Sequence, residues 1–311
     1  MEYRRLGQAG LRVSAVSLGA WITFGGTVED ETAEQIIGAA IDSGINFIDT
    51  ADAYARGEAE KVVGKAIKPY DRSKLVISSK LYWPQSEDPN DRGLSRKHIM
   101  ASIDKTLQRL GTDYLDIYFC HRYDAETPLE ETIRAMDDLV HQGKVLYWGT
   151  SVWTAAQIED AVGIARQYNL YRPQVEQPRY NMLDRHIEAE IMPSAAKHGM
   201  GFTVWSPLAQ GILTGKYNDG IPADSRAADN EGMQKQLNDD TIAKVRQLTS
   251  IAGDHGLTMS QLALAWILRR PEISSVITGA TKTSHVEANV KAAEVKLDAD
   301  VIAKIEEILA A

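Results

Sequence analysis

Residues 44–54 read GINFIDTADAY, an apolar segment with the composition of a buried β-strand that ends on Asp49. Tyr54 follows a few residues later. A core strand is expected to end in turn residues, whereas this segment ends in two side chains that can exchange protons. Whether Asp49 and Tyr54 act together depends on the fold in which the segment lies.

Similar short apolar segments recur along the chain, with helix-length amphipathic segments between them. The expected strands are 14–20, 45–50, 75–80, 115–121, 145–151, 174–177, 201–206 and 274–279. Helical patterns over 30–44, 95–111 and 128–143 each end at a glycine, and their expected capping residues are Asp30, Ser95 and Thr127.

Strands that alternate with helices predict parallel βαβ units, and eight of them favour closure into a (β/α)8 TIM barrel. A β-hairpin is expected around residues 7–10, before the first barrel strand, and residues 1–311 are expected to form one domain. The longest segment without a regular pattern, 207–238, follows the seventh strand. Loops of this length are usually functional or disordered.

The composition is that of an ordinary soluble globular protein, with 311 residues, 44% of them hydrophobic and 25% charged. A net charge of −9 argues against nonspecific nucleic-acid binding. The single cysteine, Cys120, excludes an intrachain disulfide and fits a reducing compartment. Because no apolar segment approaches the ~20 residues of a membrane span or forms a signal peptide, we expect a cytoplasmic protein that is not inserted in a membrane.

The ends of the expected strands are polar. Ligands of a (β/α)8 barrel bind where the strands end and the following loops begin. The residues at these ends are Asp49, Lys80, His121, Ser151, Gln177 and Ser206. Each alone has an ordinary structural explanation, such as a helix cap or a solvated charge. Their joint position around one barrel mouth indicates a shared site.

Tyr54 and its expected neighbours form a set of acid and electrostatic groups suited to the reduction of a carbonyl group. The unperturbed pKa of a tyrosine is ~10, and a nearby ammonium favours the phenolate, so Lys80 is expected to make the proton of Tyr54 easier to transfer. Asp49 is expected to hold Lys80 charged and in place. His121 is expected to donate a hydrogen bond to a substrate oxygen that becomes negative. The hydride has to come from a cofactor.

Asp49, Tyr54, Lys80 and His121 resemble the catalytic tetrad of the aldo-keto reductases, in the same order and on the same strands. The likeness covers nearly the whole chain. Within the family it is greatest to the voltage-gated potassium-channel β-subunit branch, through LGAWITFGG (18–26), DRGLSRKHI (91–99), LYWGTS (146–151) and WSPLAQGILTGKY (205–217). The resemblance implies NADPH-dependent reduction of aldehydes or ketones to alcohols, with Tyr54 as general acid.

The resemblance also implies the residues that contact NADP(H). Ser151 and Gln177 are expected to bond the nicotinamide carboxamide, next to Ala20, Trp21 and Asp49. The pyrophosphate is expected against Trp205, Ser206, Pro207, Leu208, Ala209, Gln210 and Gly211. Lys216 and Arg226 are expected near the adenosine phosphate. The adenine end is expected against Gly279, Thr281, His285 and Asn289.

Two positions depart from the channel branch. That branch has Asn where this chain has His121, the residue of the ordinary reductases, and this difference favours an enzyme. On the adenine side the branch has Gln at the position of His285 and an acidic residue at that of Ala288, so the adenine contacts are expected to differ. The chain opens at the hairpin, so we do not expect the amino-terminal inactivation segment of some channel subunits. The branch likeness suggests a homotetramer.

Other classes of site fit the sequence less well. The segment 149–153 lacks the second glycine of a nucleophile elbow, and no G-x-G-x-x-G follows a strand. No metal is expected, because the histidines and the lone cysteine form no ligand motif. The alternative from another class is a cofactor-bound regulatory or redox-sensing accessory subunit of a channel or other partner protein. The carbonyl substrate stays open, with mouth candidates Trp21, Tyr82, Trp83, Arg122 and Trp153.

Overall fold

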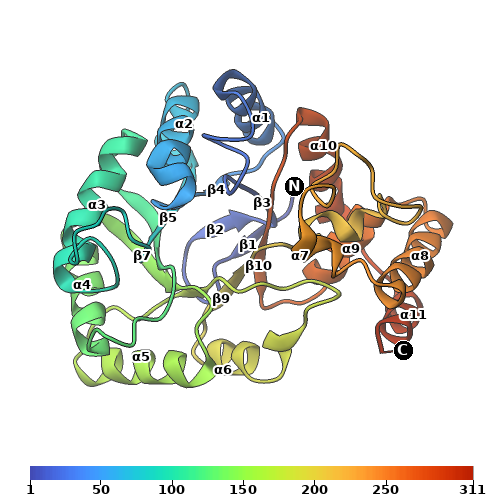
Figure 1. Ribbon diagram of the computed structural model, residues 1–311. Helices are drawn as coiled ribbons and strands as arrows, with labels where there is room; N and C mark the ends of the chain where they lie inside the picture. The colour runs from blue at the N-terminus through green and yellow to red at the C-terminus, as the bar shows by residue number, and fades with distance from the viewer. Residues whose placement is uncertain (311) are drawn as a thin grey trace.

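The computed structural model describes residues 1–310, and a closed barrel of eight strands lies at its centre (Figure 1). All neighbouring barrel strands are parallel, in the order β10-β3-β4-β5-β6-β7-β8-β9. The strands are β3 (Val16–Gly19), β4 (Phe47–Asp49), β5 (Val76–Leu81), β6 (Leu115–Cys120), β7 (Val145–Thr150), β8 (Val175–Glu176), β9 (Gly201–Val204) and β10 (Ile273–Thr278). The predicted (β/α)8 barrel is confirmed.

Helices surround the barrel (Figure 1). They are α1 (Asp30–Asp42), α2 (Glu58–Ile67), α3 (Arg96–Leu110), α4 (Leu129–His141), α5 (Ala155–Gln167), α6 (Ile191–Lys197), α7 (Glu231–Gln234), α8 (Asp239–Asp254), α9 (Met259–Leu268), α10 (Thr283–Lys291) and α11 (Ala299–Ala310). Short 3-10 helices are η1 (Tyr54–Gly57), η2 (Arg72–Lys74), η3 (His186–Glu188), η4 (Ala209–Thr214) and η5 (Ala292–Glu294). Within residues 1–310, no helix combines the length and apolarity that crossing a membrane requires.

Some local sequence predictions need correction. Ser95 caps α3 as expected, since its hydroxyl accepts the amide hydrogen of His98. Asp30 is instead the first residue of α1, where its charge favours the helix dipole. Thr127 does not cap α4 because Pro128 intervenes, and its hydroxyl donates to Asp124. The segment 207–238 joins β9 to α8 as one long connection, but η4 and α7 give it regular structure.

The predicted hairpin, β1 (Tyr3–Arg5) and β2 (Arg12–Ser14), closes the amino-terminal end of the barrel. Leu6 and Val13 are fully buried there against apolar side chains of the barrel interior. Gly7 has a φ of +59°, and a Cβ at this position would lie 2.4 Å from the carbonyl oxygen of Gly199. The close approach of hairpin and barrel therefore requires glycine. With this end closed, the barrel opens at the carboxyl ends of its strands.

The interior changes from apolar near the hairpin to polar at the open end. Side chains alternate between the two faces of a strand. In β5, Val76 belongs to the apolar cluster under the hairpin, and Ile77 points to the surrounding helices. Ser78 and Lys80 share the face of Val76 but lie nearer the open end. The alternation that builds the core therefore also turns polar side chains inward where the strands end.

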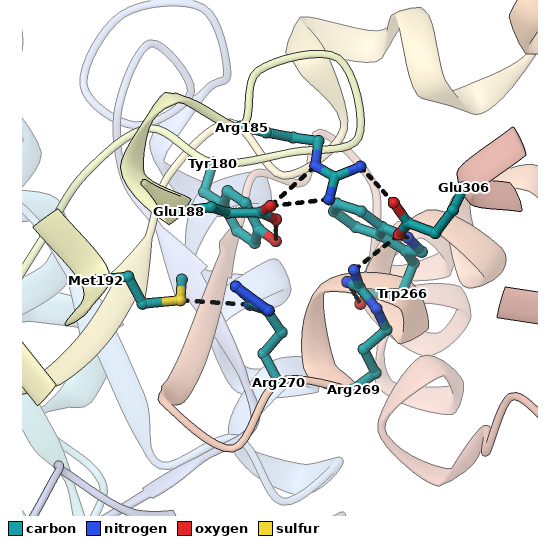
Figure 2. Close-up of polar contacts among 8 residues, drawn as sticks. All are labelled: Tyr180, Arg185, Glu188, Met192, Trp266, Arg269, Arg270 and Glu306. Carbon is teal, nitrogen blue, oxygen red and sulfur yellow. Dashed lines mark hydrogen bonds and ion pairs between the residues drawn. The ribbon is translucent and has the colours of Figure 1, made fainter. Parts of the chain in front are cut away.

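The last helix buries Val301 and Ile305 in the core and is also held by one carboxylate, Glu306 of α11 (Figure 2). Glu306 accepts hydrogen bonds from Arg185 (2.5 Å), the indole of Trp266 (3.0 Å) and Arg269 (2.9 Å). Arg185 also pairs with Glu188, which accepts the hydroxyl hydrogen of Tyr180. The network joins α11 to α9 and to the segment that follows β8.

We expect Glu306→Ala to lower the free energy of unfolding by ~1–3 kcal/mol, because it leaves the N–H of the buried Trp266 indole without its acceptor and takes one acceptor from each of two guanidinium groups. The matched control is Glu307→Ala, since Glu307 is exposed and forms none of the bonds of this network. Urea denaturation followed by circular dichroism measures the difference. Equal stability of the two variants would contradict the role given to Glu306.

Candidate functional site

Four side chains predicted to act together meet at the open end of the barrel. Asp49 is the last residue of β4, Lys80 lies near the end of β5, and His121 follows β6. Tyr54 begins η1, in the loop after β4. The ring centroids of Tyr54 and His121 are 5.9 Å apart, in an edge-to-face arrangement.

Lys80 is completely buried, and each hydrogen of its ammonium has a partner. The Nζ atom lies 2.6 Å from Oδ2 of Asp49, 2.7 Å from the carbonyl oxygen of Thr50 and 3.1 Å from the hydroxyl oxygen of Tyr54. Burial acts to lower the pKa of Lys80, but Asp49 and Tyr54 more than offset it, so the pKa lies above its ordinary value. Lys80 is therefore a fixed cation in contact with the phenol.

Asp49 collects hydrogen bonds from three other strands or their ends. Besides Lys80, it accepts the hydroxyl hydrogen of Ser78 (2.7 Å) and the side-chain amide of Gln177 (3.0 Å). The main-chain carbonyl of Asp49 also accepts the N–H of Ala20 at 2.9 Å. A buried carboxylate with this many donors has one fixed orientation, and it holds Lys80 in turn.

Two opposing effects, burial and the Lys80 ammonium, set the pKa of Tyr54. Its pKa is raised, because burial disfavours the phenolate more than the Lys80 ammonium favours it. Lys80 lowers the pKa of Tyr54 as predicted, but burial, which the sequence prediction did not include, raises it by more. Tyr54 remains a protonated donor at neutral pH, and Lys80 is placed to stabilise negative charge that develops on its oxygen.

His121 is a neutral imidazole. Burial, followed by the charges of Lys80 and Arg122, holds its pKa well below the ordinary value. Its Nδ1 atom is buried and has no hydrogen-bond partner among residues 1–310. A neutral ring has one N–H donor and one acceptor nitrogen, and it can therefore donate a hydrogen bond without bringing a second positive charge close to Lys80.

The segment after β9 has a strained backbone with free donors. Ser206, Ala209 and Gln210 have φ values of 51°, 47° and 58°, which non-glycine residues seldom adopt. The amides of Ser206 and Leu208 donate to no other group in residues 1–310. Successive unpaired N–H groups in such a backbone form a concavity that suits an anion.

This strained segment is supported from the loop after β8. The side chain of Asn181 donates to the carbonyl oxygen of Ser206 at 3.0 Å. Asn181 follows Tyr180, whose hydroxyl donates to Glu188 within the Glu306 network (Figure 2). The hydrogen-bond network around Glu306 therefore also holds the segment that carries Asn181, the residue that bonds Ser206.

Ser151 and Gln177 lie next to each other at the ends of β7 and β8. The hydroxyl of Ser151 donates to the main-chain carbonyl of Gln177 at 2.8 Å. The amide nitrogen of Gln177 donates to Asp49, whereas its amide oxygen accepts no hydrogen bond within residues 1–310. An acceptor is thus open beside the tetrad, which fits the NH2 group of a carboxamide.

The two loop cations occupy different surroundings. Lys216 lies against Gly211, and it contributes, after burial and Lys282, to the lowered pKa of His285. The guanidinium carbon of Arg226 lies 5.3 Å from the ring centroid of Trp21, a cation–π contact. Lys216 is therefore close to a residue expected at the adenine end, whereas Arg226 stands over a residue expected at the nicotinamide end.

The remaining predicted residues also lie on the open side. Gly279 and Thr281 follow β10, His285 and Asn289 lie on α10, and the Thr281 hydroxyl is 3.5 Å from Nδ1 of His285. Trp21 and Trp83 are partly exposed, as mouth residues require. Trp153 is not a mouth residue, since it is buried with its ring centroid 4.9 Å from that of Tyr123.

Sequence reasoning missed three supporting residues. Ser78 shares the inward face with Lys80, and the alternation in LVISSK would have identified it. Glu176 is fully buried and accepts hydrogen bonds from Thr150 and from the amide of Val152, a β-branched residue at a φ of 61°. Burial raises the pKa of Glu176 to about 7. Asn181 had no local signal, because its contact with Ser206 depends on how two loops meet.

A hollow of about 760 Å³ lies at the opposite end of the barrel, beside the hairpin. Two of the three arginines that line it are already engaged, and the first, Arg4, bonds Glu2 and the carbonyl oxygens of Leu268 and Ile273. Arg269 pairs with Glu306. The chemically competent groups lie instead at the open end.

Comparisons with known proteins agree with this geometry. The model of the aldo/keto reductase family matches residues 15–310. A protein of Arabidopsis thaliana named "Probable voltage-gated potassium channel subunit beta" is 48% identical over 318 residues, covering 99% of this chain and 97% of the relative. A protein of Oryza sativa subsp. japonica with the same name is 47% identical, with the same coverage. The predicted family and branch likeness are confirmed.

We expect Lys80→Met to destabilise the protein by ~3–5 kcal/mol, because it leaves the buried Asp49 carboxylate without its counter-ion. Methionine keeps the length and apolar bulk of lysine. The double variant Lys80→Met/Asp49→Asn is expected to regain most of this loss, since it contains no unpaired buried charge. Urea denaturation compares the three proteins. A double variant no more stable than the single one would show that charge pairing is not the cause.

Proposed function

The chain belongs to the aldo/keto reductase family, and on that premise we propose that it reduces aldehydes or ketones to alcohols with NADPH. The observation that carries the proposal is the buried ammonium of Lys80 in contact with both Asp49 and Tyr54, next to the neutral His121. These groups provide a proton, a fixed positive charge and a hydrogen-bond donor at one point, which is what reduction of a carbonyl oxygen requires.

Each of the four residues has a defined part in the proposed reaction. NADPH, when bound, supplies the hydride to the carbonyl carbon. His121 donates a hydrogen bond to the carbonyl oxygen and orients it. Tyr54 transfers its hydroxyl proton to that oxygen, and Lys80, held by Asp49, stabilises the phenolate as it forms. The charge of Lys80 then acts mainly on the transition state, where it accelerates the reaction.

The residues that would hold NADP(H) fit its parts in turn. The open acceptor of Gln177, with Ser151, suits the nicotinamide carboxamide. The free amides of Ser206 and Leu208 suit the pyrophosphate. Lys216, near His285, would meet the adenosine phosphate, and Arg226, whose guanidinium carbon lies 5.3 Å from the Trp21 ring centroid, would have to turn away from that ring to reach the same phosphate. Gly279, Thr281, His285 and Asn289 would line the adenine end.

A second candidate function is supported by the name that both relatives carry, "Probable voltage-gated potassium channel subunit beta". In that case the chain would bind NADPH as a regulatory or redox-sensing accessory subunit and turn over very slowly. His121 and the complete hydrogen bonding around Asp49 favour the enzyme. Steady-state turnover of a simple aldehyde separates the two functions.

We expect Tyr54→Phe to lower the rate of carbonyl reduction by ~10²–10⁴-fold, because the ring keeps its shape and loses only the transferable proton. NADPH binding, measured by fluorescence quenching, is expected to stay nearly unchanged. The matched control is Tyr168→Phe, which removes an exposed phenol hydroxyl after α5. A Tyr54→Phe variant with most of the wild-type rate would remove Tyr54 from the mechanism.

We expect Lys216→Ala and Arg226→Ala to weaken NADPH binding by roughly 10- to 100-fold, since a hydrogen bond to a charged group is worth ~1.5–3 kcal/mol. NADH binding should change little, because NADH lacks the adenosine phosphate. Lys235→Ala, an exposed lysine of the same 207–238 connection, controls for net charge. Fluorescence titration with both cofactors is the test. Equal losses for NADH and NADPH would mean that these residues act on the loop rather than on the phosphate.

A further inference from the structure

Arg122 is a half-buried cation at the reaction centre that takes no part in the proposed proton transfer. It directly follows His121, and one guanidinium nitrogen donates to the main-chain carbonyl oxygen of His121 at 2.5 Å. The guanidinium carbon lies 5.4 Å from the ring centroid of Trp83. The Trp83 ring lies 6.2 Å from the His121 ring. Arg122, Trp83 and His121 thus lie side by side at the mouth of the barrel.

This arginine has no charge partner. Within residues 1–310 no carboxylate lies within 4.0 Å of its guanidinium nitrogens. The charge of Glu176 acts to raise the pKa of Arg122. The carboxylate oxygens of Glu176, however, already accept hydrogen bonds from Thr150, Val152 and Trp153. By contrast, Lys80, the other cation that lowers the pKa of His121, is paired with Asp49. Arg122 is therefore the unneutralised cation beside Tyr54 and His121.

An unpaired cation that is partly removed from water costs free energy, which a bound anion offsets. Burial lowers the pKa of Arg122, yet a guanidinium stays charged at neutral pH. Most of its five N–H donors remain free, since it makes one hydrogen bond within residues 1–310. Their planar fork matches the oxygens of a carboxylate or a phosphate. In a protein of net charge −9, such a group distinguishes an anionic ligand from a neutral one.

We infer that Arg122 determines substrate specificity by binding an oxyanion of the carbonyl substrate, so that the chain prefers aldehydes or ketones that carry a carboxylate or a phosphate. The inference rests on the proposed reductase function and specifies its substrate class. The carbonyl would lie against Tyr54 and His121, and the anion against Arg122. Tyr82 and Trp83, edge-to-face with centroids 5.1 Å apart, would form the apolar wall beside them.

A purely structural role of Arg122 predicts different behaviour. If it only stacks on Trp83 and fixes the loop through the carbonyl of His121, its removal should impair neutral and anionic substrates alike. If it binds the substrate anion, its removal should impair only the anionic one. The difference between two substrates of the same shape therefore separates the two roles.

The test compares kcat/KM for 4-carboxybenzaldehyde with that for its methyl ester, and for glyceraldehyde 3-phosphate with that for glyceraldehyde. Arg122→Gln should lower kcat/KM for an anionic substrate by roughly 10- to 100-fold, the loss of a hydrogen bond to a charged group. The loss should appear chiefly in KM, and the neutral partner should change by less than ~3-fold. Arg122→Lys should recover part of the loss. The substrate pair whose anionic member is affected shows whether Arg122 binds a carboxylate or a phosphate.

A control variant and a binding assay separate anion recognition by Arg122 from a general effect on charge or on turnover. Arg5→Gln removes the same charge from the hairpin at the opposite end of the barrel and should change neither pair. Quenching of tryptophan fluorescence by 4-(hydroxymethyl)benzoate and by glycerol 3-phosphate reports anion binding without turnover, and Arg122→Gln should weaken whichever quencher binds. Equal losses for charged and neutral substrates would overturn the inference while reduction itself stands. Absence of reduction with all four aldehydes, in wild-type protein that binds NADPH, would overturn the proposed function and the inference with it.

Discussion

The complete burial of the Lys80 ammonium is the constraint on which the rest of the site depends. A buried cation is tolerated only with a counter-ion and with partners for all its hydrogens. Asp49 provides the charge, and its own remaining lone pairs are used by Ser78 and Gln177. The parallel register of β4 and β5 sets Asp49 directly beside Ser78. Neutralising one lysine thereby fixes side chains from β4, β5 and the end of β8.

Tyr54 is the one partner of Lys80 that faces the open mouth. The pKa of its hydroxyl is raised because burial outweighs the nearby positive charge. In the resting protein Tyr54 is therefore a protonated phenol and not a phenolate. The energetic benefit of Lys80 appears only when negative charge develops. His121 stays neutral for a related reason, since burial and two nearby cations oppose its protonation. Tyr54 thus has a cation beside it whereas His121 is neutral, and each of the two side chains can donate a hydrogen bond at the open end of the barrel.

The sequence predicted the barrel and the position of the tetrad because both follow from local patterns. Strand alternation, glycine-terminated helices and polar strand ends are all visible along the chain, and the eight-stranded closure agrees with them. Contacts between loops were not predictable in this way. The bond from Asn181 to Ser206, the position of Arg226 over Trp21 and the burial of Trp153 each depend on how distant segments meet. The raised pKa of Tyr54 could not be predicted from the sequence, because the depth at which a side chain is buried is a property of the folded chain.

We propose that this site transfers a hydride and a proton to a carbonyl group. A single-turnover experiment tests it most directly: protein loaded with one equivalent of NADPH, free of excess cofactor, is mixed with 4-nitrobenzaldehyde, and nicotinamide absorbance and alcohol are followed together. If the site reduces carbonyl groups, the bound NADPH is consumed and an equal amount of alcohol forms. NADPH that remains bound and reduced, with no alcohol produced, would contradict it.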